Sequence, residues 1–229
     1  MIPPRLRAVA ARIPLGARVA DIGTDHARLP VFLMQRGLVS SVLATDIHPE
    51  PLRRARRLLT RCGLEGVIPL VLTDGLSGLP LHDIDIVVIA GLGADTILDI
   101  WRKNPPPAHV TGLLQPMSHA ERLRAFFGES ITDECLVQEE HRLYSIMTVA
   151  GDKPTGTVSP GLRYISRALE CSDDPLLGVY LDRQIARLAA ETGGLAVSQR
   201  PEDAARLVEA REALSYLQGI KGTKGEALS

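Results

Sequence analysis

The segment Asp21-Ile-Gly-Thr-Asp-His26 brings two carboxylates, a glycine and an imidazole together at the end of a short apolar stretch. In open α/β sheets, ligands bind beside the carboxyl ends of the strands, and Gly23 would let a ligand approach the backbone closely. Asp25 stands where the dinucleotide fingerprint GxGxxG has its second glycine, and its charge would repel a phosphate. The segment therefore disfavours a dinucleotide and suits a ligand that carries an amine or a sulfonium.

Similar residues follow three more apolar stretches. Asp46 lies 23 residues beyond Gly23, a spacing at which a carboxylate can accept hydrogen bonds from both hydroxyls of a ribose, although a helix cap would explain it equally well. Asp74-Gly75 follows the third stretch, where a simple turn is the alternative. Ala90-Gly-Leu-Gly93 ends the fourth, where the alternative is tight packing of a helix.

Taken together, the four strand ends favour S-adenosylmethionine as the ligand, with S-adenosylhomocysteine as its product. In this interpretation Asp21 and Gly23 lie beside the methionine part of the cofactor. Asp46 binds the ribose, Asp74 lies near the adenine amino group, and residues 91–93 lie near the methyl group that is transferred. The predicted cofactor-binding residues are Asp21, Gly23, Asp46, Ile47, Asp74, Gly75, Ala90, Gly91 and Gly93.

The elements that must position these residues alternate between strands and helices. Short stretches rich in Val, Ile, Leu and Ala predict strands at 18–22, 41–45, 67–72, 84–90 and 110–114. Helical periodicity predicts helices at 5–12, 29–36, 51–61, 94–102 and 119–127. Two further strands, at 134–140 and 144–149, leave no room for a helix between them and should form an antiparallel hairpin. The pattern predicts a doubly wound α/β sheet, Rossmann-like in class.

A Gly, Pro, Thr and Ser-rich segment at 151–160 marks a domain boundary. Beyond it, apolar residues recur at helical spacing in two stretches that are separated by Gly193, Gly194 and Pro201, which predicts an antiparallel helical hairpin. We therefore expect a cofactor-binding domain at 1–150, a helical hairpin domain at 160–219 and a flexible tail at 220–229.

Composition narrows the function further. Residues 1–61 carry eleven arginines against four acids, whereas the net charge of the whole chain is -1, and this asymmetry indicates a polyanionic partner for the first part. The three cysteines and six histidines show no metal-ligand spacing, so no metal is expected. No apolar stretch is long enough for a membrane span, and the arginines near the start suit an amphipathic helix better than a transit peptide. We expect a cytoplasmic protein.

The motifs also resemble one family. The runs Ala20-Asp-Ile-Gly-Thr-Asp-His-Ala27 with Leu29-Pro30, Thr73-Asp-Gly-Leu76, Ile89-Ala-Gly91 with Gly93, and Leu114-Gln-Pro116 are similar to those of the bacterial tRNA adenine-N1 methyltransferases that modify adenine 22. The resemblance extends over nearly the whole chain. It implies a class I methyltransferase fold, S-adenosylmethionine as cofactor, and a helical appendage that takes part in tRNA binding.

Individual residues are candidates for catalysis and for contact with the RNA. Asp25 and His26 are the catalytic candidates. Asp25 would act electrostatically on the target base, and His26 would fix the orientation of Asp25. The candidates for contact with the RNA are Arg28, Arg53, Arg57, Arg61, Gln115 and Pro116. Arg53, Arg57 and Arg61 recur at helical spacing along one face of a predicted helix, for which contact with phosphates and a merely solvated face are equally good explanations. We expect tRNA as the partner, with no membrane and no obligatory protein partner.

Four positions depart from the family pattern. Arg28 stands where tyrosine is usual, Leu92 and Ala94 lie in what is commonly GMGG, and Met117 follows Pro116 where asparagine is usual. A guanidinium plane can stack on a base as an aromatic ring does. Two alternatives stay open on these grounds: a noncatalytic RNA-binding protein that retains S-adenosylmethionine, and a methyltransferase for a different RNA or for a small molecule.

Overall fold

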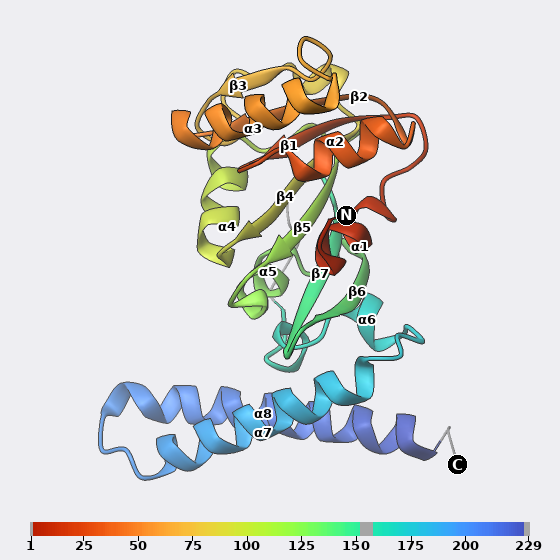
Figure 1. The fold of residues 1–229 in the computed structure, drawn as a ribbon. Helices are drawn as coiled ribbons and strands as arrows, with labels where there is room; N and C mark the ends of the chain where they lie inside the picture. Colours follow the sequence, from red (N-terminus) through yellow and green to blue (C-terminus); the bar gives the residue numbers. More distant parts are fainter. Residues whose placement is uncertain (1, 152–157, 227–229) are drawn as a thin grey trace.

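The computed structural model describes residues 2–151 and 158–226. Its centre is a seven-stranded sheet in the order β3-β2-β1-β4-β5-β7-β6 (Figure 1). Strands β1 to β5 are parallel, and β7 runs antiparallel to both of its neighbours. The strands are β1 (Ala17–Ile22), β2 (Val39–Asp46), β3 (Leu70–Leu72), β4 (Ile86–Leu92), β5 (Thr111–Pro116), β6 (Ile131–Glu139) and β7 (Arg142–Ala150). The doubly wound sheet predicted from the apolar stretches is therefore confirmed.

Helices cover both faces of the sheet. The helices α1 (Pro4–Ala10), α2 (Arg28–Gln35) and α3 (Pro49–Cys62) pack on one face, in a core that includes Val19, Val42 and Val88. The helices α4 (Ala94–Lys103) and α5 (Ala120–Phe127) pack on the other, in a core that includes Val87 and Ile89. Successive residues of β4 thus enter opposite cores, as the alternation of side chains along a strand requires.

A helical appendage lies below the antiparallel end of the sheet (Figure 1). It is built from α6 (Arg167–Glu170), α7 (Leu177–Ala196) and α8 (Pro201–Glu226). A one-turn 3₁₀ helix at Gly161–Arg163 precedes α6, and another, at Leu81–Asp83, lies between β3 and β4. α7 and α8 form the predicted hairpin, and their buried leucines share a third core with Leu136 of β6. The end of the hairpin projects beyond the sheet on the side toward which β4 and β5 point (Figure 1).

Two sequence predictions need correction. Residues 220–229 were predicted to form a flexible tail, but α8 continues to Glu226, because Ile220 packs against the hairpin core and Lys224 Nζ donates a hydrogen bond to the Ser172 carbonyl. The third strand begins at Leu70 rather than at residue 67, because Val67 belongs to a turn in which its N–H binds the Leu64 carbonyl. Most of the predicted boundary segment, residues 152–157, lies outside the described residues.

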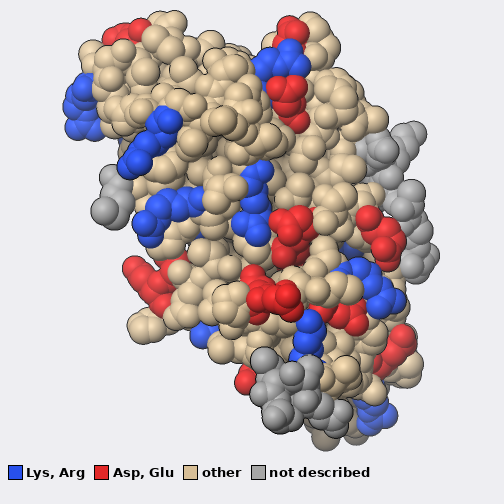
Figure 2. All heavy atoms as spheres, turned by 90° about the vertical axis from the view of Figure 1, so that its right-hand side faces the viewer, with Lys and Arg blue, Asp and Glu red and all other residues tan. Residues whose placement is uncertain are grey.

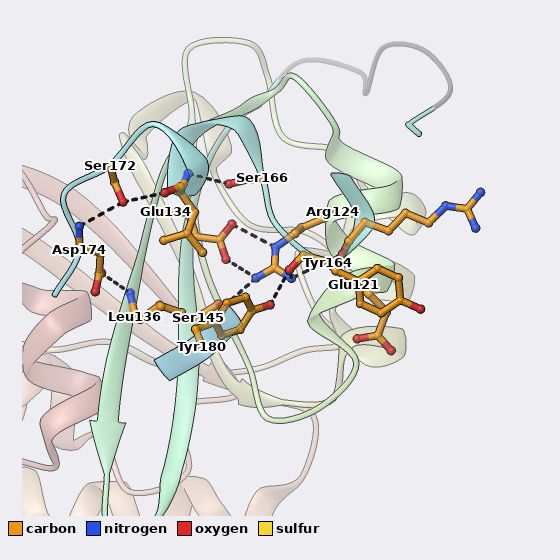
Figure 3. Close-up of polar contacts among 12 residues, drawn as sticks. Glu121, Arg124, Glu134, Leu136, Ser145, Tyr164, Ser166, Ser172, Asp174 and Tyr180 are labelled. Carbon is orange, nitrogen blue, oxygen red and sulfur yellow. Dashed lines mark hydrogen bonds and ion pairs between the residues drawn. The ribbon is translucent and has the colours of Figure 1, made fainter. Parts of the chain in front are cut away.

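A buried ion pair connects the sheet to the appendage (Figure 3). Arg124 of α5 donates from Nε and Nη2 to both carboxylate oxygens of Glu134 on β6, at 3.1 and 2.5 Å, and both side chains are almost completely buried. The guanidinium also donates to Ser145 Oγ of β7 and to the Tyr164 carbonyl, each at 2.9 Å. Tyr180 of α7 donates to that same carbonyl at 2.6 Å. One arginine thus joins α5, both antiparallel strands and the segment that leads into the hairpin.

None of the helices in residues 2–151 and 158–226 is both long and apolar enough to cross a membrane.

Candidate active site

A cleft of about 660 Å³ opens where β1, β2 and β4 end. Parallel strands of a doubly wound sheet place their carboxyl ends at one edge, so residues far apart in the sequence meet there. Of the predicted cofactor residues, the cleft is lined by Asp21, Gly23, Asp46, Ile47, Asp74, Gly75, Ala90 and Gly91. Gly93 is not among its lining residues and instead precedes the first turn of α4. The structure therefore brings together eight of the nine residues.

The loop after β1 has an uncommon backbone. Gly23, Asp25 and Ala27 all have positive φ angles, of 71°, 52° and 52°. Aspartate tolerates this conformation better than most residues, whereas Ala27 gains nothing from it locally. The Thr24 N–H donates to the Thr45 carbonyl at 2.8 Å, which ties the loop to the end of β2. The surrounding structure thus holds the loop in a strained shape, as is common at functional sites.

Asp46 lies at the floor of the cleft and is almost completely buried. Its Oδ1 accepts a hydrogen bond from the His48 N–H at 3.0 Å, and its Oδ2 lies 3.4 Å from the Asp25 nitrogen. A carboxylate offers about four acceptor positions, so two remain for a ligand. The backbone therefore fixes the orientation of Asp46 while leaving it able to bind a diol.

Asp21 is the second carboxylate in the cleft and is 5% exposed. Burial raises the pKa of Asp21 to about 6, a hydrogen bond from Thr24 Oγ1 at 2.6 Å opposes this rise, and the neighbouring Asp46 carboxylate adds to it. A nearby cation favours the ionised form of a buried carboxyl group that has only one hydroxyl partner. The position thus suits the ammonium or sulfonium that the sequence indicated.

The far side of the cleft combines apolar and polar groups. Ile47 and Ile100 line it, and a side chain at Gly75 would bring its Cβ within 3.0 Å of Ile100, so only glycine leaves that isoleucine in place. Asp74 is half-exposed and forms an ion pair with Lys103. This arrangement offers apolar surface for a flat ring beside the Asp74 carboxylate, which Lys103 holds in position.

The catalytic candidates lie at the mouth of the cleft. Asp25 and Arg28 are exposed, and His26 is partly buried, with its Nε2 at 3.4 Å from Asp25 Oδ2. Because Asp25 and Arg28 flank His26 on the strained loop and the first turn of α2, their side chains can contact a substrate that enters from solvent.

The remaining predicted residues lie in different places. Gln115 and Pro116 are buried in β5 behind the cleft: Gln115 Nε2 donates to the Pro116 carbonyl at 2.9 Å, and Gln115 pairs with Ala90 across the sheet. Arg57 and Arg61 line a second, open hollow beside the cleft. Arg53 is not among the residues that line it and forms an ion pair with Glu50.

One wall of the cleft comes from the start of the chain and was missed in the sequence. Arg5 and Leu6 of α1 line it together with Pro3, which precedes the helix. Thr96 of α4 is a further lining residue. The Arg5 backbone N–H and guanidinium both donate to the Glu139 side chain of β6. No local motif identifies these residues, because α1 reaches the cleft only through its packing on the sheet.

Residues 2–147 match the family described as "Methyltransferase domain". The chain belongs to this family. The methyltransferase is 32% identical, over 157 residues, to the tRNA (adenine(22)-N(1))-methyltransferase of Bacillus subtilis (strain 168), and the alignment covers 65% of each chain. It thus spans just under two thirds of the length of that curated relative. This similarity agrees with the family resemblance that the motifs indicated.

Two solved structures extend the comparison of this methyltransferase. The B. subtilis m1A22 tRNA methyltransferase TrmK superposes with a TM-score of 0.83, at 22% identity, over 96% of this chain and 99% of that one, which shows that the fold, hairpin included, is shared. Sp1610 of Streptococcus pneumoniae, in complex with S-adenosyl-L-methionine, is 25% identical, with a TM-score of 0.76, over 93% of this chain and 100% of that one. The class I methyltransferase fold with a C-terminal hairpin is thereby confirmed.

Proposed function

We propose that this protein transfers the methyl group of S-adenosylmethionine to N1 of adenine 22 in tRNA. The cleft at the strand ends supports the transfer chemistry, because it gathers the carboxylates and glycines that the cofactor requires. The similarity to the B. subtilis enzyme supports the choice of base. The substrate partner is then tRNA and the compartment the cytoplasm.

The residues of the cleft fit the cofactor. Its volume of about 660 Å³ lies within the usual range for small-molecule sites. Asp21 provides a negative charge for the amino group or the sulfonium, Asp46 provides acceptors for the ribose, and Ile47 provides apolar surface for the adenine. Gly91 has a φ angle of 85° and no atom within 4 Å of where a Cβ would stand, which leaves open space beside the backbone.

The protein residues act by positioning and by charge. S-adenosylmethionine supplies an electrophilic methyl group when bound. Adenine N1 has its own lone pair, so no side chain needs to remove a proton before attack, and orientation supplies much of the rate. Asp25 would accept a hydrogen bond from the N6 amine and stabilise the positive charge that the base gains. His26 would hold Asp25 in place, and Arg28 would stack on the base.

Cofactor affinity should fall in mild acid because of Asp21. The ionised form attracts the cationic cofactor, and the folded-state pKa of about 6 means that Asp21 is mostly ionised at neutral pH and mostly protonated one unit below 6. We expect the Kd for S-adenosylmethionine to rise about tenfold between pH 7 and pH 5, as measured by calorimetry. In Asp21→Asn the affinity should be weak and should show little change over this range.

The same substitution should stabilise the cofactor-free protein. Because the folded pKa of Asp21 lies above the ordinary value of 3.8, ionisation disfavours folding at pH 7. Asp21→Asn should therefore raise the free energy of unfolding by up to about 3 kcal/mol at pH 7, and the gain should vanish as the pH falls toward 4. Urea titrations at pH 7 and pH 4 measure the free energy of unfolding of both proteins. Equal values at pH 7 would show that the ionised Asp21 side chain does not destabilise the fold.

Methyl transfer is tested with unmodified tRNA transcripts and S-adenosylmethionine, followed by mass spectrometry of the nucleosides. The proposal predicts N1-methyladenosine as the product. A protein that binds both the cofactor and tRNA but forms no methylated nucleoside would instead be a noncatalytic RNA-binding protein. Asp25→Ala separates the roles within the site, since we expect it to retain cofactor affinity and lose turnover.

A further inference from the structure

The second hollow, which adjoins the cleft, has a strongly basic lining. It has a volume of about 550 Å³, is open to solvent, and is lined by His26, Arg54, Arg57, Thr60 and Arg61. His26 lines both the cleft and this hollow, so the two adjoin at His26. No carboxylate is among its lining residues.

The three arginines of the hollow belong to one face of α3. Arg57 and Arg61 are one turn apart, and Arg54 precedes Arg57 by three residues, so their side chains follow one another along the helix. Ala55 and Leu59 hold the opposite side of α3 in the core. The hydrophobic packing of α3 therefore fixes which arginines face solvent.

These arginines have no carboxylate partner among the described residues. Arg53 differs, because its guanidinium is held by Glu50. Arg54, Arg57 and Arg61 make no salt bridge in residues 2–151 and 158–226. Thr60, which also lines the hollow, donates from Oγ1 to the Arg56 carbonyl and to Glu65. Unpaired arginines on a rigid helix are well suited to bind phosphates.

The appendage offers no comparable surface. Residues 177–226 contain seven basic and seven acidic residues, and Arg187, Arg206 and Lys221 form ion pairs with acids. On the face in Figure 2, several basic side chains lie together at the upper left, at the level of α2 and α3 in Figure 1, whereas basic and acidic side chains are intermixed in the lower half. The charge that attracts a polyanion is therefore on the sheet domain.

We propose that Arg54, Arg57 and Arg61 bind consecutive phosphates of the RNA strand that flanks the target adenosine, and that they lead this strand past His26 into the cleft. This inference rests on the proposed function for the identity of the RNA. The face of α3 provides positive groups at intervals of about one helical turn, and His26, which lines both hollows, marks where the strand would pass from one to the other.

The test measures tRNA affinity as a function of salt, by fluorescence anisotropy with the full chain. The triple variant Arg54→Gln/Arg57→Gln/Arg61→Gln should bind an unmodified transcript roughly 10- to 100-fold more weakly at low salt, and the slope of log K against log salt should fall in magnitude by about 2. Its affinity for S-adenosylmethionine should not change. In steady state the KM for tRNA should rise while kcat stays the same.

A control of equal charge is Arg36→Gln/Arg183→Gln/Arg211→Gln, which removes three exposed arginines outside the hollow. It should change tRNA affinity by less than threefold. An equal loss in both variants, or an unchanged slope in the first, would overturn the proposal. Undiminished tRNA binding together with lost binding to phosphatidylglycerol vesicles would assign the arginines to a membrane surface instead.

Binding and catalysis are read separately in this design. A wild-type protein that shows the predicted slopes but makes no N1-methyladenosine would contradict the proposed function and support the RNA path. If both triple variants methylate tRNA with the same KM for tRNA, the result would support the proposed function and contradict the proposed path of the RNA along α3.

Discussion

Replacing Asp46 with alanine should weaken S-adenosylmethionine binding about 100-fold and abolish methylation at ordinary cofactor concentrations. The carboxylate is nearly buried, is held by backbone N–H groups of residues 25 and 48, and has two acceptor positions left for the ribose hydroxyls. Two hydrogen bonds to a charged group, at about 1.5 kcal/mol each, account for the expected loss. Calorimetric titration with the cofactor measures it.

Asp46→Asn is the matched control for this prediction. Asparagine keeps the size of the side chain and one carbonyl oxygen, so it should bind the cofactor about tenfold more weakly than the wild type and ten times more tightly than Asp46→Ala. The thermal midpoints of both variants should show that they are folded. Wild-type affinity in the folded Asp46→Ala protein would mean that the ribose does not bind at the end of β2.

Replacing Arg124 with methionine should lower the free energy of unfolding by about 3 to 5 kcal/mol. The substitution leaves the Glu134 carboxylate buried without the guanidinium that donates to both of its oxygens, and it removes a donor from the Tyr164 carbonyl (Figure 3). A buried charge without its partner costs far more than the ion pair contributes over an apolar pair. Urea denaturation of the cofactor-free protein measures the loss.

The double variant Arg124→Met/Glu134→Leu distinguishes an unpaired charge from general damage to the core. It removes both charges and should recover most of the stability that the single variant loses. As an exposed control, Arg122→Met breaks the ion pair with Asp95 and should cost less than about 1 kcal/mol. A double variant no more stable than Arg124→Met would show that the ion pair is not the cause.

The sheet and the cofactor cleft could be predicted from the sequence because both depend on local patterns. Apolar stretches identify buried parallel strands, and the residues at or just beyond the end of each strand must lie at the carboxyl edge of the sheet. Asp21, Asp46 and Asp74 therefore come together as predicted. Gly93 was placed with them because it follows the fourth strand; it precedes α4 directly after β4 and is not among the residues that line the cleft.

Other parts depend on contacts that are distant in sequence. Arg5 reaches the cleft only because α1 packs across the sheet and binds Glu139. Arg124 would be expected at the surface of an amphipathic helix, but it is buried against β6, β7 and the segment that leads into the appendage. The choice of Arg54 over Arg53 for the hollow follows from the rotation of α3 about its axis, which the core residues determine.

Primer extension on tRNA after incubation with the protein and S-adenosylmethionine decides whether adenine 22 is methylated, because a methyl group on adenine N1 blocks base pairing. We expect a strong stop at adenine 22, absent with Asp46→Ala and absent in a transcript that carries guanine at position 22. A stop at another adenine, or N1-methyladenosine formed equally on the guanine-22 transcript, would contradict this expectation.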